Sequence, residues 1–304
     1  MTKVRFKKLA GNYQLWLMVF PALAYIIIFH YVPMYGVQLA FREFEFLKGI
    51  TGGKWVGLKY IREYVKSANF GLTMRNTFFI SLAGHVFGFP MPIILALAMN
   101  QIRNSRLKKT LQTTVTLPHF ISTVVMVSMI NIFLSPNNGL LQMALKGLRL
   151  IGPDANLLGD PAAFIPVFVL SGIWQGCGWG SIIYLAALSN VDMETYDAAK
   201  IDGANKFQLV RYIELPTLAP TIVLLLILST GSLLSVGFEK ILLMQNGLNF
   251  EASEVISTYV YKRGIRGADF NLGAAIGLFN TVINFTLLVI SNQIAKRVSG
   301  TSLM

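Results

Sequence analysis

Charged residues are scarce in this chain of 304 residues. Asp, Glu, Lys and Arg make up 13% of the sequence, whereas hydrophobic residues make up 54%. An ordinary soluble domain carries about 25% charged residues. The chain is therefore too apolar for a soluble domain, and we expect a membrane protein.

Cysteine and histidine are also rare. The single cysteine, Cys177, excludes an internal disulfide and a cysteine-cluster metal site. His30, His85 and His119 lie far apart in the chain and lack the spacing of metal ligands. Nothing in the sequence resembles a Ser/His/Asp or Cys/His arrangement, a zinc motif or a nucleotide-binding fingerprint. We therefore predict no metal site, no catalytic residues and no ATPase site in this chain.

The net charge is nevertheless +12. In a soluble protein such an excess would suggest nucleic acid as a partner. Here the basic residues cluster beside apolar runs, where membrane topology and anionic lipid account for them. We expect contact with a lipid bilayer and no nucleic acid.

Long apolar runs dominate the sequence. Each is close to the roughly 20 residues that a helix needs to cross about 30 Å of hydrocarbon. The runs are continuous rather than alternating, which favours helices over a barrel. The third run is rich in Thr and broken at Pro118. We predict an all-α membrane protein, a single domain over 1–304, with six spans at 13–35, 73–99, 111–134, 164–188, 220–243 and 272–295.

The orientation follows from the short loops. Lysine and arginine divide evenly between the two sides of a six-span arrangement, but segments 1–12 and 100–109 concentrate them in short stretches. The positive-inside rule has most weight there. We predict that both termini are cytoplasmic, which also places the loop 189–219 in the cytoplasm.

Residues 196–216, here called the 196–216 loop, are longer than a connection between spans requires. An acid, Asp197, begins a short helix where the helix dipole favours it. Gly203 then interrupts, a second short helix can occupy 204–212, and Pro216 ends the loop. Small residues on the outer surface would let another protein enclose this protrusion closely. The alternative is an amphipathic loop lying on the membrane surface.

Polar residues within the fourth span are candidates for a transport path. Gln175 and Trp179 are four residues apart and share a helix face, and Trp174 precedes them. An indole ring can stack on a sugar ring while an amide binds its hydroxyls. The alternative places both tryptophans in the aromatic belt at the headgroups.

Two later positions are further candidates. Asn280 and Asn284 repeat the spacing of four on the sixth span. They either line a polar path or hold helices together by hydrogen bonds, and we favour the structural role. Glu239, at the outer end of the fifth span, either pairs with Lys240 or faces the cavity.

The 196–216 loop resembles the EAA loop of importer permeases in the ATP-binding-cassette (ABC) superfamily. The family pattern is E-A-A, three residues, G, nine residues, I-x-L-P, and the same spacing occurs here. Asp197 stands where the family usually has Glu, which keeps the charge but shortens its reach. The matching positions are Ala198, Ala199, Gly203, Ile213, Leu215 and Pro216, and Asp202-Gly203-Ala204 matches the D-G-A common in the sugar-importing branch.

Other stretches are similar to the carbohydrate branch of this family, and most similar to LplB-type permeases for complex oligosaccharides in Gram-positive bacteria. They are Trp55-Val56-Gly57-Leu58, Asn76-Thr77, residues 117–122, and Trp174-Gln175 with residues 184–188.

The resemblance implies a six-helix, type I importer permease in the cell membrane of a Gram-positive bacterium. It implies a heterodimer with a second, homologous permease, and two cytoplasmic ATPases that hold ATP and magnesium and grip the 196–216 loops. An extracellular lipid-anchored binding protein would deliver an oligosaccharide, which crosses by alternating access. One alternative is an ABC importer for a non-sugar solute. Another is an ion-coupled carrier, for which His85 is almost the only ionisable residue available within the spans.

Overall fold

The computed structural model describes residues 13–50 and 52–299. These residues form helices and connections, and the extended backbone among them pairs only at two isolated bridges, Arg42 with Trp55 and Glu45 with Gly49. They divide into two compact units. The first comprises Met1–Ser67 and Val260–Phe279, and the second Ala68–Tyr259 and Asn280–Met304. The basic segment 1–12, which contributes to the predicted orientation, lies outside the described residues.

The predicted all-α architecture is confirmed. Within residues 13–50 and 52–299, five helices are long and apolar enough to cross a membrane, and a sixth span results if one bent pair of helices counts as one. The five are Gln14–Ala40, Asn69–Asn100, Pro161–Leu188, Lys206–Thr230 and Phe270–Arg297, and the bent pair is Ser105–Phe120 with Thr123–Phe133.

In the first unit, one long helix precedes a loop held by an amide side chain. The helical segments are α2 (Tyr13–Ile26), η1 (Ile27–Tyr31), α3 (Val32–Met34), η2 (Tyr35–Ala40), α4 (Lys59–Lys66), η6 (Tyr261–Arg266) and the start of α17 (Phe270–Ser299). Asn271 donates to the carbonyls of Leu39 and Arg42 and accepts from the Phe44 N–H. One side chain therefore satisfies three backbone groups of this loop.

The second unit contains most of the helices. They are α5 (Asn69–Ala83), η3 (Gly84–Gly88), α6 (Pro90–Asn100), α7 (Ser105–Thr116), η4 (Leu117–Phe120), α8 (Thr123–Phe133), α9 (Leu140–Gly147), α10 (Pro161–Leu188), α11 (Met193–Ile201), α12 (Lys206–Leu209), η5 (Val210–Glu214), α13 (Leu215–Thr230), α14 (Phe238–Met244), α15 (Phe250–Ser253) and α16 (Ile256–Val260), followed by the rest of α17.

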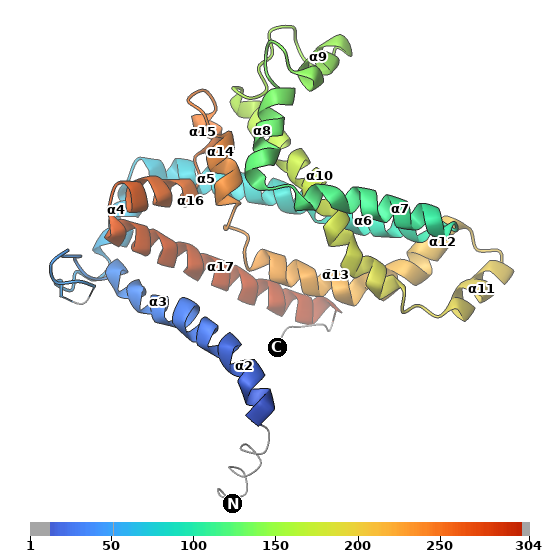
Figure 1. Cartoon of the computed structure of the whole chain (residues 1–304), viewed down its shortest axis with the longest axis horizontal. Helices are drawn as coiled ribbons and strands as arrows, with labels where there is room; N and C mark the ends of the chain where they lie inside the picture. The colour runs from blue at the N-terminus through green and yellow to red at the C-terminus, as the bar shows by residue number, and fades with distance from the viewer. Residues whose placement is uncertain (1–12, 51, 300–304) are drawn as a thin grey trace, which may run out of the picture. The chain divides into compact units, whose positions relative to one another are not determined.

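Helix α10 is the centre of this unit and contacts α5, α6, α7, η4 and α13 (Figure 1). It begins where the Asp160 carboxylate accepts from the Ala162 N–H at 2.9 Å and Pro161 occupies the first turn. Tyr184 and Leu188 near its other end pack with α6 and α13 in an apolar cluster. The helix that carries three of the predicted transport residues is thus fixed on several sides.

The third predicted span, 111–134, has a sharper break than the sequence indicated. Its first helix starts at Ser105, because the Asn104 side chain accepts from the N–H groups of Arg106 and Leu107. The chain then turns by 96°. Pro118 cannot donate a backbone hydrogen bond, and Ser122 caps a new helix by accepting from the Val125 N–H.

The helix that contains most of the fifth predicted span, 220–230 of 220–243, has other bounds than that span. The helix begins at Lys206, passes through Pro216 and stops at Thr230. Pro216 lies in the first turn of α13, directly after the π-helical turn η5, where its missing donor is tolerated. A non-helical break over 231–237 separates α13 from α14. The proline therefore does not end the 196–216 loop, and the loop is continuous with the span.

Gly178 is required where α10 meets α7. A Cβ atom at this position would lie 2.0 Å from the Val115 carbonyl oxygen, which belongs to rigid helix backbone. We expect Gly178→Ala to destabilise the protein by about 1–3 kcal/mol through overpacking, measured by thermal unfolding in detergent. Gly176→Ala is the matched control, because a Cβ there meets nothing within 4 Å. Equal stability of the two variants would contradict the predicted close packing.

Candidate functional site

The 196–216 loop has the predicted helix–glycine–helix form, with different bounds. Helix α11 starts at Met193 because the Asp192 carboxylate accepts from the Glu194 N–H at 3.1 Å. Asp197 is therefore in the middle of this helix rather than in its first turn. Gly203 follows with φ +81°, a left-handed conformation that favours glycine.

A capping box starts the second helix of the loop. The Asn205 side chain accepts from the Gln208 N–H, and the Gln208 side chain accepts from the Asn205 N–H. The helix that begins here continues without interruption to Thr230. Any movement of the second half of the loop is therefore a movement of a membrane-spanning helix.

The predicted coupling residues form a mostly exposed surface. Asp197, Ala198, Asp202, Gly203, Leu215 and Pro216 are exposed, while Ala199, Ala204 and Ile213 are half-buried. Large apolar side chains stand among them, with Ile201 87% and Phe207 72% exposed. Asp197 pairs with Lys200 at 2.8 Å, but both side chains are exposed, so this ion pair is weak and can exchange for another. Small residues beside protruding apolar ones are typical of a protein-binding surface.

A buried carboxylate, not singled out in the sequence, lies at the base of this loop. Glu214 is fully buried. Its Oε1 accepts from Asn100 Nδ2 at 2.7 Å, from Gln101 Nε2 at 2.8 Å and from the Tyr196 hydroxyl at 3.2 Å. Asn100 Nδ2 also donates to the Tyr196 oxygen at 3.2 Å. Removing the carboxylate would deprive three half-buried donors of their shared acceptor.

The sequence did contain a signal for Glu214, since an acid stands directly before an apolar run. Tyr196 remains a donor to it because burial, and then the nearby Glu214 charge, raise the pKa of the Tyr196 phenol above its ordinary value. The phenol therefore stays protonated at neutral pH. This network joins α11, η5 and the end of α6.

Gln175 and Trp179 contact the same segment, as their spacing predicts. Gln175 Nε2 donates to the Ile121 carbonyl at 2.8 Å, at the bend between η4 and α8. The Trp179 ring stacks on His119, with ring centroids 4.6 Å apart and an interplanar angle of 7°. The amide thus stabilises the bend, and the aromatic pair remains partly exposed.

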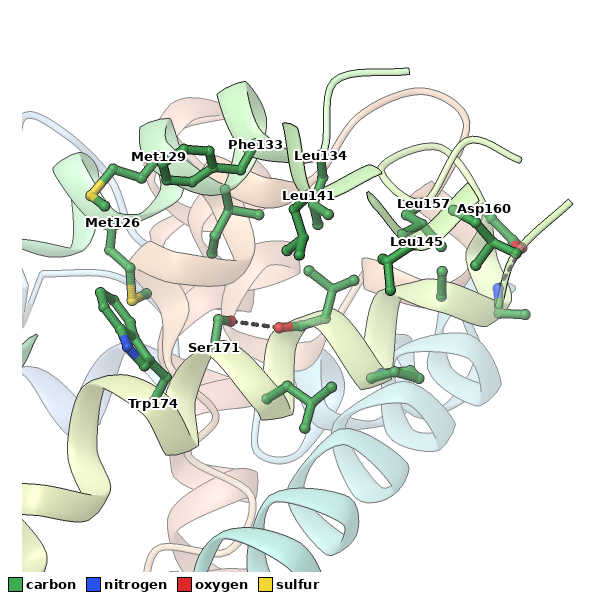
Figure 2. Close-up of a pocket in the computed structure, with 17 residues that line it drawn as sticks. Met126, Met129, Phe133, Leu134, Leu141, Leu145, Leu157, Asp160, Ser171 and Trp174 are labelled. Atoms are coloured by element: carbon green, nitrogen blue, oxygen red, sulfur yellow. Dashed lines mark hydrogen bonds between the residues drawn. The ribbon is translucent and has the colours of Figure 1, made fainter. Parts of the chain in front are cut away.

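Trp174 lies in different surroundings. It lines an apolar cavity of about 690 Å³ formed by α8, α9 and α10. Figure 2 shows Trp174 at one end of this cavity and Asp160 at the other, with Met126 and Met129 beside the indole. Trp174 and Gln175 therefore contact different parts of the protein.

The remaining predicted path residues are separated. Asn284 is buried, and its Oδ1 accepts from the Leu234 N–H at 2.9 Å in the break after α13, while its Nδ2 donates to Ser235. Asn280 Oδ1 is buried and has no hydrogen-bond partner among the residues described. Glu239 is exposed, whereas Lys240 is buried and donates to the Phe168 carbonyl at 2.7 Å.

The sequence also matches known proteins. Residues 88–300 match the family model described as "Binding-protein-dependent transport system inner membrane component". Protein LplB of Bacillus subtilis is 38% identical, with 93% of this chain and 88% of the relative covered. The polygalacturonan/rhamnogalacturonan transport system permease protein YteP of the same organism is 37% identical, with 95% and 90% covered.

Solved structures are also similar. A chain in the crystal structure of a bacterial ABC transporter involved in the import of the acidic polysaccharide alginate has a TM-score of 0.87 and 35% identity. The alignment covers 97% of this chain and 99% of that one. A second structure holds the alginate transporter in complex with a pentasaccharide-bound periplasmic protein, with a TM-score of 0.88.

Asn284 and Asn280 differ in a way that can be measured. Asn284→Ala would leave the Leu234 N–H unpaired and should destabilise the protein by about 1–3 kcal/mol. Asn280→Ala, one turn away on the same helix, should cost little because its Oδ1 already lacks a described partner. Tryptophan fluorescence during denaturant unfolding of the purified protein would compare them. Equal losses would contradict the assignment of a structural role to Asn284 alone.

Proposed function

Because the chain belongs to the family of binding-protein-dependent transport system inner membrane components, we propose that it is the membrane permease subunit of an ATP-driven importer of oligosaccharides. It is an integral membrane protein and a transport subunit rather than an enzyme. The carrying observation is its similarity, over nearly its whole length, to sugar permeases and to a chain of an ABC transporter involved in alginate import. These relatives favour a sugar over a non-sugar solute.

The partners follow from this role. The solved relative binds a periplasmic protein loaded with an alginate pentasaccharide. By analogy, an external binding protein delivers the sugar to this chain, and separate ATPases supply the energy. ATP and magnesium belong to those ATPases. A second, homologous permease completes the pathway, and we place both termini of this chain in the cytoplasm of a Gram-positive bacterium.

The 196–216 loop is the coupling element in this proposal. Its exposed apolar residues and small residues provide the surface that an ATPase grips, and Asp197 can exchange Lys200 for a cation of the ATPase. Because α12, η5 and α13 form one helix from Lys206 to Thr230, displacement of the loop tilts a span directly. ATP-driven closure would thereby open the sugar path outward, and hydrolysis would return it inward.

The transported sugar is proposed to contact the aromatic and amide side chains along α10. The stacked pair of Trp179 and His119 is partly exposed and offers a flat apolar face to a sugar ring. The sequence assigns five further residues to the same path: Trp174, Gln175, Glu239, Asn280 and Asn284. Among them, Gln175 and Asn284 already bind backbone groups, so their role in the path is to hold its walls.

Reconstitution tests the transport function. The chain, its partner permease and the ATPases are placed in proteoliposomes, and the loaded binding protein is added outside. Uptake of a labelled oligosaccharide should require internal ATP and should persist when an ionophore collapses the proton gradient. Uptake that continues without ATP and stops with the ionophore would identify an ion-coupled carrier instead.

Gly203 should be essential for coupling. Gly203→Leu introduces a bulky side chain at φ +81°, where an L-residue is strained by about 1–2 kcal/mol. We expect uptake to fall by roughly tenfold or more, since close docking and loop geometry are both lost. Membrane insertion should be unchanged.

Two variants separate these effects. Gly203→Ala adds the strain without the bulk and should reduce uptake less. Gly147→Leu on α9 is the control, because a Cβ there meets nothing within 4 Å. Normal ATP-driven uptake by Gly203→Leu would overturn the coupling role of this glycine.

A further inference from the structure

The network around Glu214 connects parts of the chain that are far apart in sequence. Asn100 and Gln101 end α6, Tyr196 lies on the first helix of the 196–216 loop, and Glu214 ends the π-helical turn of the second. All three donors converge on one oxygen, Oε1. Lys108 of α7 also donates to Asn100 Oδ1 at 3.4 Å. The hydrogen bonds to one carboxylate thus join the end of α6, α11 and η5, and α7 is linked to them through Asn100.

A negative charge at this position has a clear physical consequence. Hydrogen bonds to an ionised acceptor are shorter and stronger than those between neutral groups. The bonds from the half-buried Asn100 and Gln101 are 2.7 and 2.8 Å long and end on a fully buried carboxylate, where competition from water is reduced. The base of the loop is therefore held more firmly than its exposed tip.

Glu214 lies beside a cavity, and one of its carboxylate oxygens can accept a further hydrogen bond. It lines a cavity of about 280 Å³ that also includes Arg103, Lys200 and Lys206. Its second oxygen, Oε2, is buried and has no partner among the residues described. The carboxylate can therefore take another donor while the network shifts, without first breaking every bond that it makes.

We propose that Glu214 is a positioning residue for energy coupling, which ties the 196–216 loop to the end of α6. When an ATPase moves the loop, α13 follows because it is continuous with the loop, and the second span follows because Glu214 holds α6. Without this attachment the loop would move α13 alone, and ATP would be hydrolysed without a complete reorientation. This inference rests on the proposed function. It adds the residue through which one ATPase-driven movement of the 196–216 loop displaces two spans.

The test uses the full complex in proteoliposomes with its ATPases, partner permease and binding protein. Three quantities are measured for each variant: the amount of ATPase bound to the permease, the rate of ATP hydrolysis, and sugar imported per ATP hydrolysed. Glu214→Gln keeps the size of the side chain and removes its charge. We expect normal ATPase binding and sustained hydrolysis, with import per ATP lowered about tenfold, as for loss of a charge-assisted hydrogen bond.

Further variants grade the effect. Tyr196→Phe removes one donor and should lower import per ATP less than Glu214→Gln, while Glu214→Ala should lower it more. The effects of Tyr196→Phe and Glu214→Ala should be non-additive, because the two side chains are in contact. Glu63→Gln, an exposed carboxylate on α4, is the matched control and should match the unmodified complex.

The outcomes are distinct. Import and hydrolysis that fall together at a constant ratio, or a loss of ATPase binding, would assign Glu214 to folding or docking alone and overturn the proposal. An unchanged ratio with normal rates would also overturn it. Failure of the proposed function has a different signature, because the unmodified complex itself would then show no ATP-driven sugar uptake.

Discussion

Every backbone N–H and C=O group inside hydrocarbon needs a partner within the protein. Unbroken helices meet this requirement by themselves, but this chain breaks its helices at several points. At three of these points an amide side chain from elsewhere bonds to the freed backbone groups. Gln175 binds the Ile121 carbonyl at the bend after η4, Asn284 binds the Leu234 N–H after α13, and Asn76 binds the carbonyls of Glu251 and Glu254.

These amide contacts attach the breaks in the spans to neighbouring helices. A break whose backbone groups bind a side chain of a neighbouring helix is attached to that helix. Gln175 joins α10 to the 96° bend, and Asn284 joins α17 to the break that follows α13. Polar residues within spans are thus required first for structure, and a transport path must use the polar groups and aromatic faces that remain.

The 196–216 loop differs between its tip, which is exposed, and its base, which is buried. Its tip exposes Ile201 and Phe207 and is held there by few contacts, whereas its base buries Glu214 among three donors. An exposed tip can be gripped by another protein. A buried base passes the displacement to α6 and α13 instead of absorbing it. The tip of the loop thereby serves to bind another protein, and its base gives a rigid connection to the spans.

The sequence by itself determined the helical class, the membrane location, the approximate spans and the helix–glycine–helix loop. These features depend on local composition and spacing, which the chain shows directly: long apolar runs permit only helices in lipid, and Gly203 permits a left-handed turn. Only the tertiary structure decided where the fifth span breaks, how sharply the third span bends at Pro118, and which polar residues support these breaks. The effect of Pro216 depends on the π-helical turn before it. The role of Glu214 depends on three donors, two of which lie more than a hundred positions away in the chain. Contacts between such distant residues arise from packing, and a single sequence does not show them.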